Sequence, residues 1–230
     1  IAGDGGKALQ LVRSHVPDII VSDVMMPRMN GYKLCKTIKE DINISHIPVI
    51  LLTARDDRQS QISGYKNGAD GYLSKPFEVE MLMELIRNRL KNREYTKKRY
   101  LNAGLIPTPE ESTISLTDET FLIKLNSIIQ ENIENSNLGI QFICQEVGLG
   151  RSSLYNKLKA LTSMGANEYI SKLRIEKAIT LISGTDMPFS EIAEKTGFTT
   201  PSYFSTAFKQ YTGETPSQYK ERKNKGLADK

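Results

Sequence analysis

The sequence predicts an α/β half followed by an all-α half, and three observations lead to this division. Over residues 7–93, short apolar segments alternate with amphipathic helical patterns. Residues 94–116 are first basic and then punctuated by proline. Beyond them the spacing is helical, with two similar helix-turn-helix patterns. We therefore place an α/β domain at residues 1–92, a linker at 93–116, a helical domain at 117–224 and a tail at 225–230.

The elements of the α/β domain follow in the order of a doubly wound, flavodoxin-like parallel sheet. Apolar strand patterns occupy residues 18–23, 48–54 and 71–76. Helical patterns occupy residues 6–16, 30–40, 57–68 and 77–90, and Gly68 suits the C-cap of the third. Strands that are apolar on both faces are typical of a parallel sheet with helices on both sides.

The first helix-turn-helix pattern covers residues 140–161. A turn follows the helix that ends near Gly148, and Leu154, Leu158 and Leu161 form the apolar stripe of the second helix. The remaining faces of this second helix are polar and basic, which is typical of a helix that enters a DNA groove.

The second helix-turn-helix pattern covers residues 189–211, and a rod-like helix at residues 165–183 joins the two. Thr200 is a good N-cap, and Pro201 suits the first helical position. We expect Phe204 and Phe208 to face inward, which leaves the polar residues between them for contacts with a partner.

Composition limits the classes of function. The helical half carries 14 Lys and Arg against 13 Asp and Glu, so a nucleic-acid partner must be argued from local placement of charge. The chain has no apolar run of about 18 residues, and its first residues, IAGDGG, are not expected to act as a signal peptide. Cys35 and Cys144 are expected to be reduced thiols in a cytosolic protein, and His15 and His46 lack partners at zinc-ligand spacing.

Polar residues stand at the carboxyl ends of the three predicted strands, namely Asp23, Thr53 and Lys75. Ligands of an open parallel sheet bind at this edge. An aspartate can accept a phosphoryl group, and the transfer requires neutralisation of charge. Lys75 can supply a positive charge and the Thr53 hydroxyl can donate a hydrogen bond, so the pattern predicts a phosphoacceptor site.

The segment DVMMPRMNG, the segment LLTA and a strand that ends in Lys-Pro resemble the receiver domain of bacterial response regulators. The resemblance covers residues 1 to about 92. It implies that Asp23 is the phosphoacceptor, that Thr53 is the conserved hydroxyl, and that Lys75 contacts the phosphoryl group. In that family the peptide bond between the residues matching Lys75 and Pro76 is usually cis. The resemblance also implies that phosphorylation changes a dimerisation face formed by the helix before Gly68 and the helix at 78–92.

The resemblance also implies a Mg²⁺ cofactor, held by Asp23 and the backbone carbonyl of Met25, and a rotamer switch at Tyr72. A packed core tyrosine is the alternative for Tyr72. Receivers begin with a strand that ends in an acidic pair, and here Ile1 already looks like the end of the second strand. Asp4 is no substitute for that pair, so we expect an incomplete magnesium site and a chain that is a fragment of a longer protein.

Residues 117–222 resemble the DNA-binding domain of the AraC family of transcription activators. The matching segments are SSLYNKLKALTSM, ANEYI followed by an arginine four residues later, EIAEKTGF and SYFSTAFKQYTGETPSQYK. The resemblance implies base contacts from Ser152, Tyr155, Asn156, Pro201, Ser202, Ser205 and Thr206. We add Arg151, Lys157, Lys159, Thr200 and Lys209 as DNA contacts, the lysines to phosphates, and the residues Lys220, Arg222 and Lys223 near the C-terminus as weaker candidates. Asn156 suits adenine.

Together these patterns predict a phosphorylation-regulated, sequence-specific transcription regulator of a two-component phosphorelay, without enzymatic activity of its own. The expected partners are promoter DNA, a histidine kinase in cis or in trans, and a second copy of the chain, with RNA polymerase as a further candidate and no membrane contact from this segment. We expect a cytoplasmic protein, whose parent chain can be anchored in the inner membrane if it is a hybrid sensor kinase. The alternatives are a segment serving a hybrid histidine kinase whose output is phosphotransfer, and a freestanding response regulator.

Overall fold

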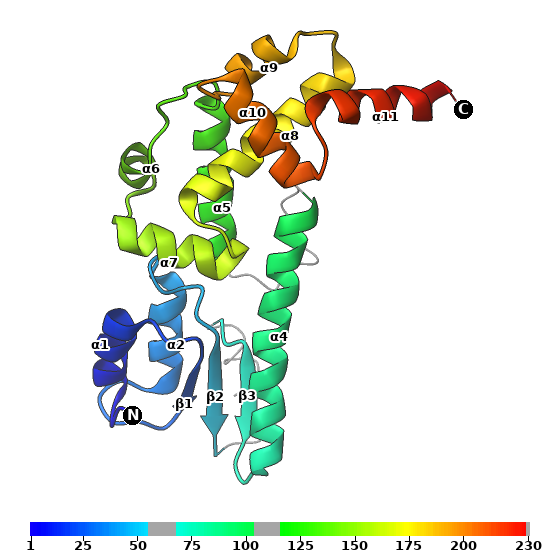
Figure 1. Cartoon of the computed structure of the whole chain (residues 1–230). Helices are drawn as coiled ribbons and strands as arrows, with labels where there is room; N and C mark the ends of the chain where they lie inside the picture. Colours follow the sequence, from blue (N-terminus) through cyan, green and yellow to red (C-terminus); the bar gives the residue numbers. More distant parts are fainter. Residues whose placement is uncertain (55–67, 104–115, 229–230) are drawn as a thin grey trace. The chain divides into compact units, whose positions relative to one another are not determined.

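A computed structural model describes residues 1–54, 68–103 and 116–228 of this chain (Figure 1). The chain divides into two compact units. One consists of Ile1–Ile123 with Asn156–Ser163, and the other of Lys124–Tyr155 with Met164–Lys230. No helix among the described residues is long and apolar enough to cross a membrane.

The first part of the chain is an α/β layer structure, as the sequence predicts. Its elements are α1 (Gly5–His15), β1 (Ile20–Asp23), α2 (Gly31–Glu40), β2 (Val49–Thr53), β3 (Gly71–Ser74) and α4 (Val79–Ala103). The strands form one parallel sheet in the order β1-β2-β3. This register aligns the three strands so that their carboxyl ends lie at one edge of the sheet.

Helices cover both faces of this sheet. On one face, buried side chains of α1, α2 and the strands form a single core: Val12, Leu34, Cys35, Ile38, Val49 and Leu51. On the other face, α4 packs so closely that a Cβ on Gly71 would lie 3.3 Å from a methyl group of Leu85. The doubly wound fold class is therefore confirmed (Figure 1).

The turn after β1 explains why glycine follows the strand so closely. A Cβ at Gly31 would collide with the backbone carbonyl of Asp23, so only glycine allows α2 to begin against the end of β1. Asn30 caps this helix, because its side chain accepts a hydrogen bond of 2.9 Å from the Lys33 N–H. The turn thereby fixes the loop that follows Asp23.

Three expectations differ from the structure or fall outside it. The last helix of the α/β part continues to Ala103, through the first eleven residues of the segment that we placed in the linker 93–116. No strand includes Ile1, where the sequence suggests the end of one. The helix expected at residues 57–68 and the rest of the linker lie largely outside the described residues.

The helical part confirms both helix-turn-helix patterns. Its elements are α5 (Leu116–Glu131), α6 (Ile140–Val147), α7 (Arg151–Thr162), α8 (Ala166–Gly184), α9 (Phe189–Lys195), α10 (Pro201–Thr212) and α11 (Pro216–Ala228). The first pattern is α6–α7 and the second is α9–α10. The rod between them, α8, has 19 residues, and a rise of 1.5 Å per residue makes it about 28 Å long.

Local sequence fixes the second helix-turn-helix as expected. Gly197 adopts φ +74°, the left-handed conformation that favours glycine, at the turn between α9 and α10. The Thr200 side chain caps α10 by accepting a 3.1 Å hydrogen bond from Tyr203 N–H. Phe204 and Phe208 are fully buried, which confirms that they face inward.

Candidate functional site

Three polar residues lie at the carboxyl edge of the sheet. Asp23 is the last residue of β1, Thr53 is the last residue of β2, and Lys75 follows the last residue of β3. The Lys75 Nζ forms an ion pair with Asp23 Oδ2. Its backbone N–H also donates a 2.6 Å hydrogen bond to the Thr53 carbonyl, which holds the ends of β2 and β3 together.

The Asp23 carboxylate is exposed enough to react and is held in one orientation. Its side chain is 35% exposed, and its Oδ1 accepts a 3.0 Å hydrogen bond from the Met25 N–H. Partial burial opposes ionisation, but the hydrogen bonds from Lys75 and Met25 outweigh it and hold the pKa of Asp23 below its usual value. The carboxylate is therefore ionised at neutral pH, the state that a nucleophile requires.

Two further features at this edge agree with the receiver resemblance. The Lys75–Pro76 peptide bond is cis. Tyr72 of β3 is half-buried against the core, and its hydroxyl lies 3.3 Å from the Tyr32 hydroxyl. In this conformation Tyr72 is a packed tyrosine, and its role as a switch stays a prediction.

The magnesium site is incomplete in the described residues. Asp23 supplies a carboxylate and Met25 a backbone carbonyl, whereas Mg²⁺ demands octahedral coordination by oxygen. No group of three or more His, Cys, Asp or Glu side chains suited to a metal occurs within residues 1–54, 68–103 and 116–228. The residues present do not by themselves fit the ion.

Sequence reasoning missed the role of Asp4. Its side chain caps α1 by accepting a 3.0 Å hydrogen bond from the Lys7 N–H, and it forms an ion pair with Arg28. Arg28 lies in the loop after Asp23 and adopts φ +62°. This pair therefore ties the reactive loop to the start of α1. The signal for the cap was present, because aspartate directly before a helical pattern is a typical N-cap.

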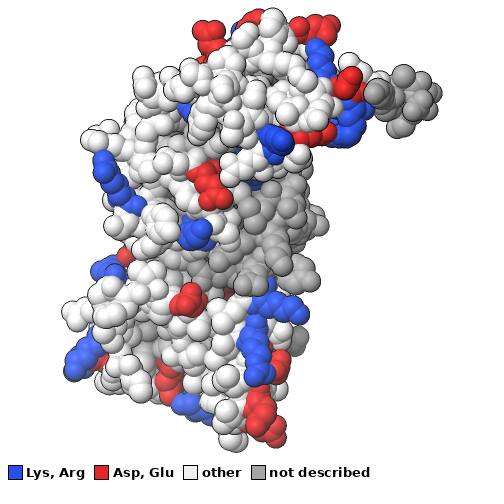
Figure 2. Space-filling view, viewed as in Figure 1, with Lys and Arg blue, Asp and Glu red and all other residues white. Residues whose placement is uncertain are grey.

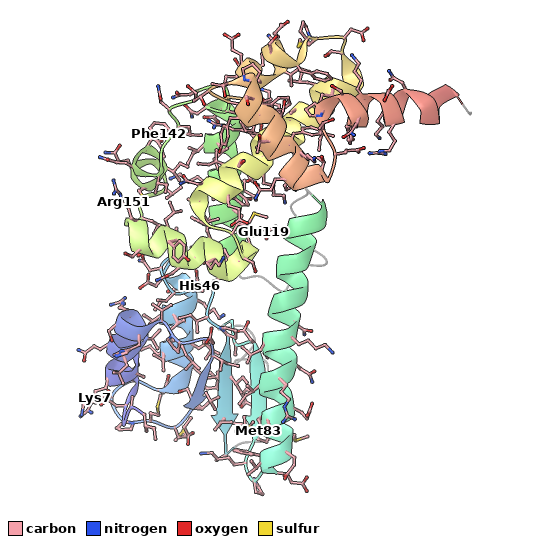
Figure 3. The ribbon with its side chains drawn as sticks, in the orientation of Figure 1. Lys7, His46, Met83, Glu119, Phe142 and Arg151 are labelled. Atoms are coloured by element: carbon pink, nitrogen blue, oxygen red, sulfur yellow. The ribbon has the colours of Figure 1, made fainter. Side chains whose placement is uncertain are left out.

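The two recognition helices present most of the predicted DNA contacts to solvent. On α7 the exposed residues are Arg151, Ser152, Tyr155, Asn156 and Lys159. On α10 and its cap they are Thr200, Pro201, Ser202, Thr206 and Lys209, with Ser205 half-buried. Arg151 stands at the start of α7 (Figure 3). Exposure makes these residues available to DNA, and their individual roles stay predictions.

Lys157 is an exception among the predicted contacts. Its side chain is fully buried, forms a 2.5 Å ion pair with Asp118 of α5, and lies 5.1 Å from the centre of the Phe121 ring. Burial lowers the pKa of Lys157, and Asp118 opposes that shift. An ammonium group with these partners does not reach a phosphate, so the structure places Lys157 in the interior of the fold.

Two of the candidate cations near the C-terminus also have partners within the chain. Arg222 forms a 2.7 Å ion pair with Glu214, and Lys220 forms a 3.1 Å ion pair with Asp186. On the face that Figure 2 shows, the acidic and basic side chains of the described residues are interspersed without a continuous basic patch. Attraction to any DNA sequence is therefore expected to depend on few exposed cations.

Comparison with known protein families assigns both parts of the chain. The response regulator receiver domain matches residues 1–87, and a helix-turn-helix domain matches residues 143–222. A probable transcriptional regulator of Pyropia yezoensis, ycf29, is 30% identical over 179 residues, which cover 73% of this chain and 81% of that protein. The chain belongs to the response-regulator family. This response regulator joins a receiver to an AraC-type helix-turn-helix domain.

Two further proteins are similar to different portions of this response regulator. "Histidine kinase P4" of Formosa agariphila is 42% identical over 221 residues, and these cover 96% of this chain but only 16% of that protein. The C-terminal domain of the two-component response regulator yesN from Fusobacterium nucleatum is 31% identical, with a TM-score of 0.40. That similarity covers 42% of this chain and 93% of the solved chain.

Proposed function

We propose that this response regulator is a transcription regulator whose sequence-specific binding to promoter DNA is controlled by phosphorylation of Asp23. The observation that carries the proposal is the placement of Asp23, Thr53 and Lys75 at one sheet edge, with Lys75 paired to Asp23, in a chain that also holds two helix-turn-helix units. The chain acts as a regulator and not as an enzyme, because these groups accept a phosphoryl group without turning over a substrate.

The chemistry follows from the groups at the edge. An Asp23 carboxylate oxygen attacks phosphorus of a phosphohistidine on a partner kinase, the P–N bond breaks, and the imidazole leaves with a proton. Lys75, which now pairs with the carboxylate, can move to a phosphoryl oxygen and neutralise part of its charge. The Thr53 hydroxyl donates to another phosphoryl oxygen from the neighbouring strand.

The kinase partner can be in the same polypeptide or in another. The similarity of 96% of this chain to a part of a protein named histidine kinase supports the output end of a hybrid sensor kinase. The similarity to a probable transcriptional regulator over 81% of its length supports a freestanding regulator. In either case promoter binding places this segment in the cytoplasm. Translating the DNA upstream of this segment distinguishes the two arrangements.

Phosphorylation is expected to increase self-association of the receiver. The first turns of α4 expose an apolar surface formed by Val79 and Met83, which lie four residues apart on one side of the helix and are 67% and 43% exposed. Figure 3 shows Met83 on this helix. Burial of this surface in a dimer would bring two DNA-binding domains together, and a coupling of about 1–3 kcal/mol would raise DNA affinity 5- to 150-fold. Sedimentation with and without a phosphoryl mimic tests this; no change in self-association or in DNA affinity contradicts it.

The DNA contacts are expected to fail in two distinguishable ways. Lys159→Ala should weaken binding to all sequences about equally and lower the salt slope by about one, because a phosphate contact is lost. Asn156→Ala should cost about 1–3 kcal/mol on the selected operator and relax base choice at one position. Both variants are titrated against a duplex selected from a random pool and against scrambled DNA, across a salt series. An equal loss on both duplexes for Asn156→Ala shows that this residue does not read a base.

A further inference from the structure

Arg174 of α8 connects two segments that are distant in the sequence. It is the arginine that follows the ANEYI segment, and no role in the proposed site accounts for it. Its Nη2 donates a 2.7 Å hydrogen bond to the carbonyl of Asn135, in the segment between α5 and α6. Its guanidinium also lies 6.0 Å from the centre of the Phe198 ring, at the turn between α9 and α10.

The contact at this turn leaves no spare room. A Cβ on Gly197 would lie 2.9 Å from both Nε and Nη2 of Arg174 and would collide with the Ile133 carbonyl. The turn of the second helix-turn-helix is thus packed directly on the guanidinium and on the segment that leads into the first. Only glycine allows this approach, at a position where φ is +74°.

The guanidinium is held here at an energetic cost. Burial lowers the pKa of Arg174, and its buried Nε has no hydrogen-bond partner among the residues that the structure describes. A buried donor without a partner destabilises a fold. A contribution to stability therefore does not explain this side chain well. The planar guanidinium is better explained by the geometry that it imposes on the segment before α6 and on the turn between α9 and α10.

The effect of Arg174 extends into the recognition helix through aromatic contacts. The Phe198 ring lies 5.7 Å from the Tyr203 ring and 5.4 Å from the Phe204 ring, both in α10. Phe204 is fully buried, whereas Tyr203 is 55% exposed on the helix that is proposed to read bases. Because a packed interior deforms little, a shift of Phe198 moves α10 as a body.

We propose that Arg174 is a positioning residue that fixes α10 against the segment leading into the first helix-turn-helix, so that the chain accepts one spacing between its two DNA half-sites. The ligand is double-stranded DNA with two half-sites, and the inference rests on the proposed DNA binding. Arg174 touches no base in this scheme. It decides which separation of the half-sites the two recognition helices can occupy together.

The test measures discrimination between spacings and not affinity alone. The full chain selects a duplex from a random pool, and the duplex is then remade with one base pair inserted between the half-sites. Arg174→Lys keeps the positive charge but replaces the planar guanidinium with a compact ammonium group. It is expected to reduce the preference for the selected spacing about 5- to 150-fold, the range of a typical coupling between two sites. Phe198→Leu should reduce it similarly, and the double variant should add little further loss.

A matched control lies on the same helix. Lys177 also reaches the segment before α6, through a 3.3 Å ion pair with Glu134. Lys177→Met should keep the wild-type preference for spacing. If Arg174→Lys lowers the melting temperature but keeps the wild-type preference, Arg174 is only structural and the inference is overturned. If the wild-type chain selects no sequence at all, the proposed DNA binding itself fails.

Discussion

Replacing Asp23 by Asn is expected to abolish incorporation of hydroxylamine-labile phosphate from a partner kinase or from acetyl phosphate. The amide has the shape of the carboxylate but lacks the nucleophilic oxygen, and it cannot form the ion pair with Lys75. The loss of phosphate incorporation should be complete, since the carboxylate is the group that becomes phosphorylated. The measurement is incorporation of radioactive phosphate from a labelled phosphodonor. It uses a receiver that also includes the acidic pair expected to bind Mg²⁺.

The matched control is an acidic residue of the same domain that lies away from the sheet edge. Glu40 ends α2 and forms an exposed pair with Lys36, at 3.8 Å. Glu40→Gln removes the same charge and should label like the wild type. Undiminished labelling of Asp23→Asn would refute the assignment. Equal loss in both variants would point to reduced net charge as the cause.

The residues at the sheet edge could be predicted because parallel topology dictates where they meet. Asp23, Thr53 and Lys75 each follow an apolar strand, and parallel strands place their carboxyl ends at one edge. The inward orientation of Phe204 and Phe208 could be predicted for a similar reason, since helical period alone separates buried from exposed positions.

The end of α4 could not be predicted by the same means. Residues 93–103 contain two Lys, two Arg and one Glu and show no apolar period, so composition alone suggested a linker. These residue types nevertheless have good intrinsic helix propensity, and a helix that has already formed continues through them at little cost. The ion pair of Asp4 with Arg28 was hidden for another reason, because it depends on a left-handed backbone at Arg28.

Lys157 shows where a pattern based on residue type fails. Three residues after Leu154, it lies beside the apolar stripe of α7, and its charge suggested a phosphate contact. Its partner Asp118 is 39 residues earlier in the chain, on another helix. Helical spacing does not reveal such a partner, so only the fold shows that the ammonium is inside.

Replacing Lys157 by Met is therefore expected to destabilise the fold by about 3–5 kcal/mol, because Asp118 is left as a buried charge without its ion-pair partner. Lys159→Met, on the exposed side of the same helix, should change stability by less than about 0.5 kcal/mol. Urea unfolding followed by circular dichroism measures both. Adding Asp118→Leu to Lys157→Met should recover much of the loss, since an apolar pair removes the uncompensated charge. A Lys157→Met chain with wild-type stability and a reduced salt slope for DNA binding would instead make Lys157 a phosphate contact.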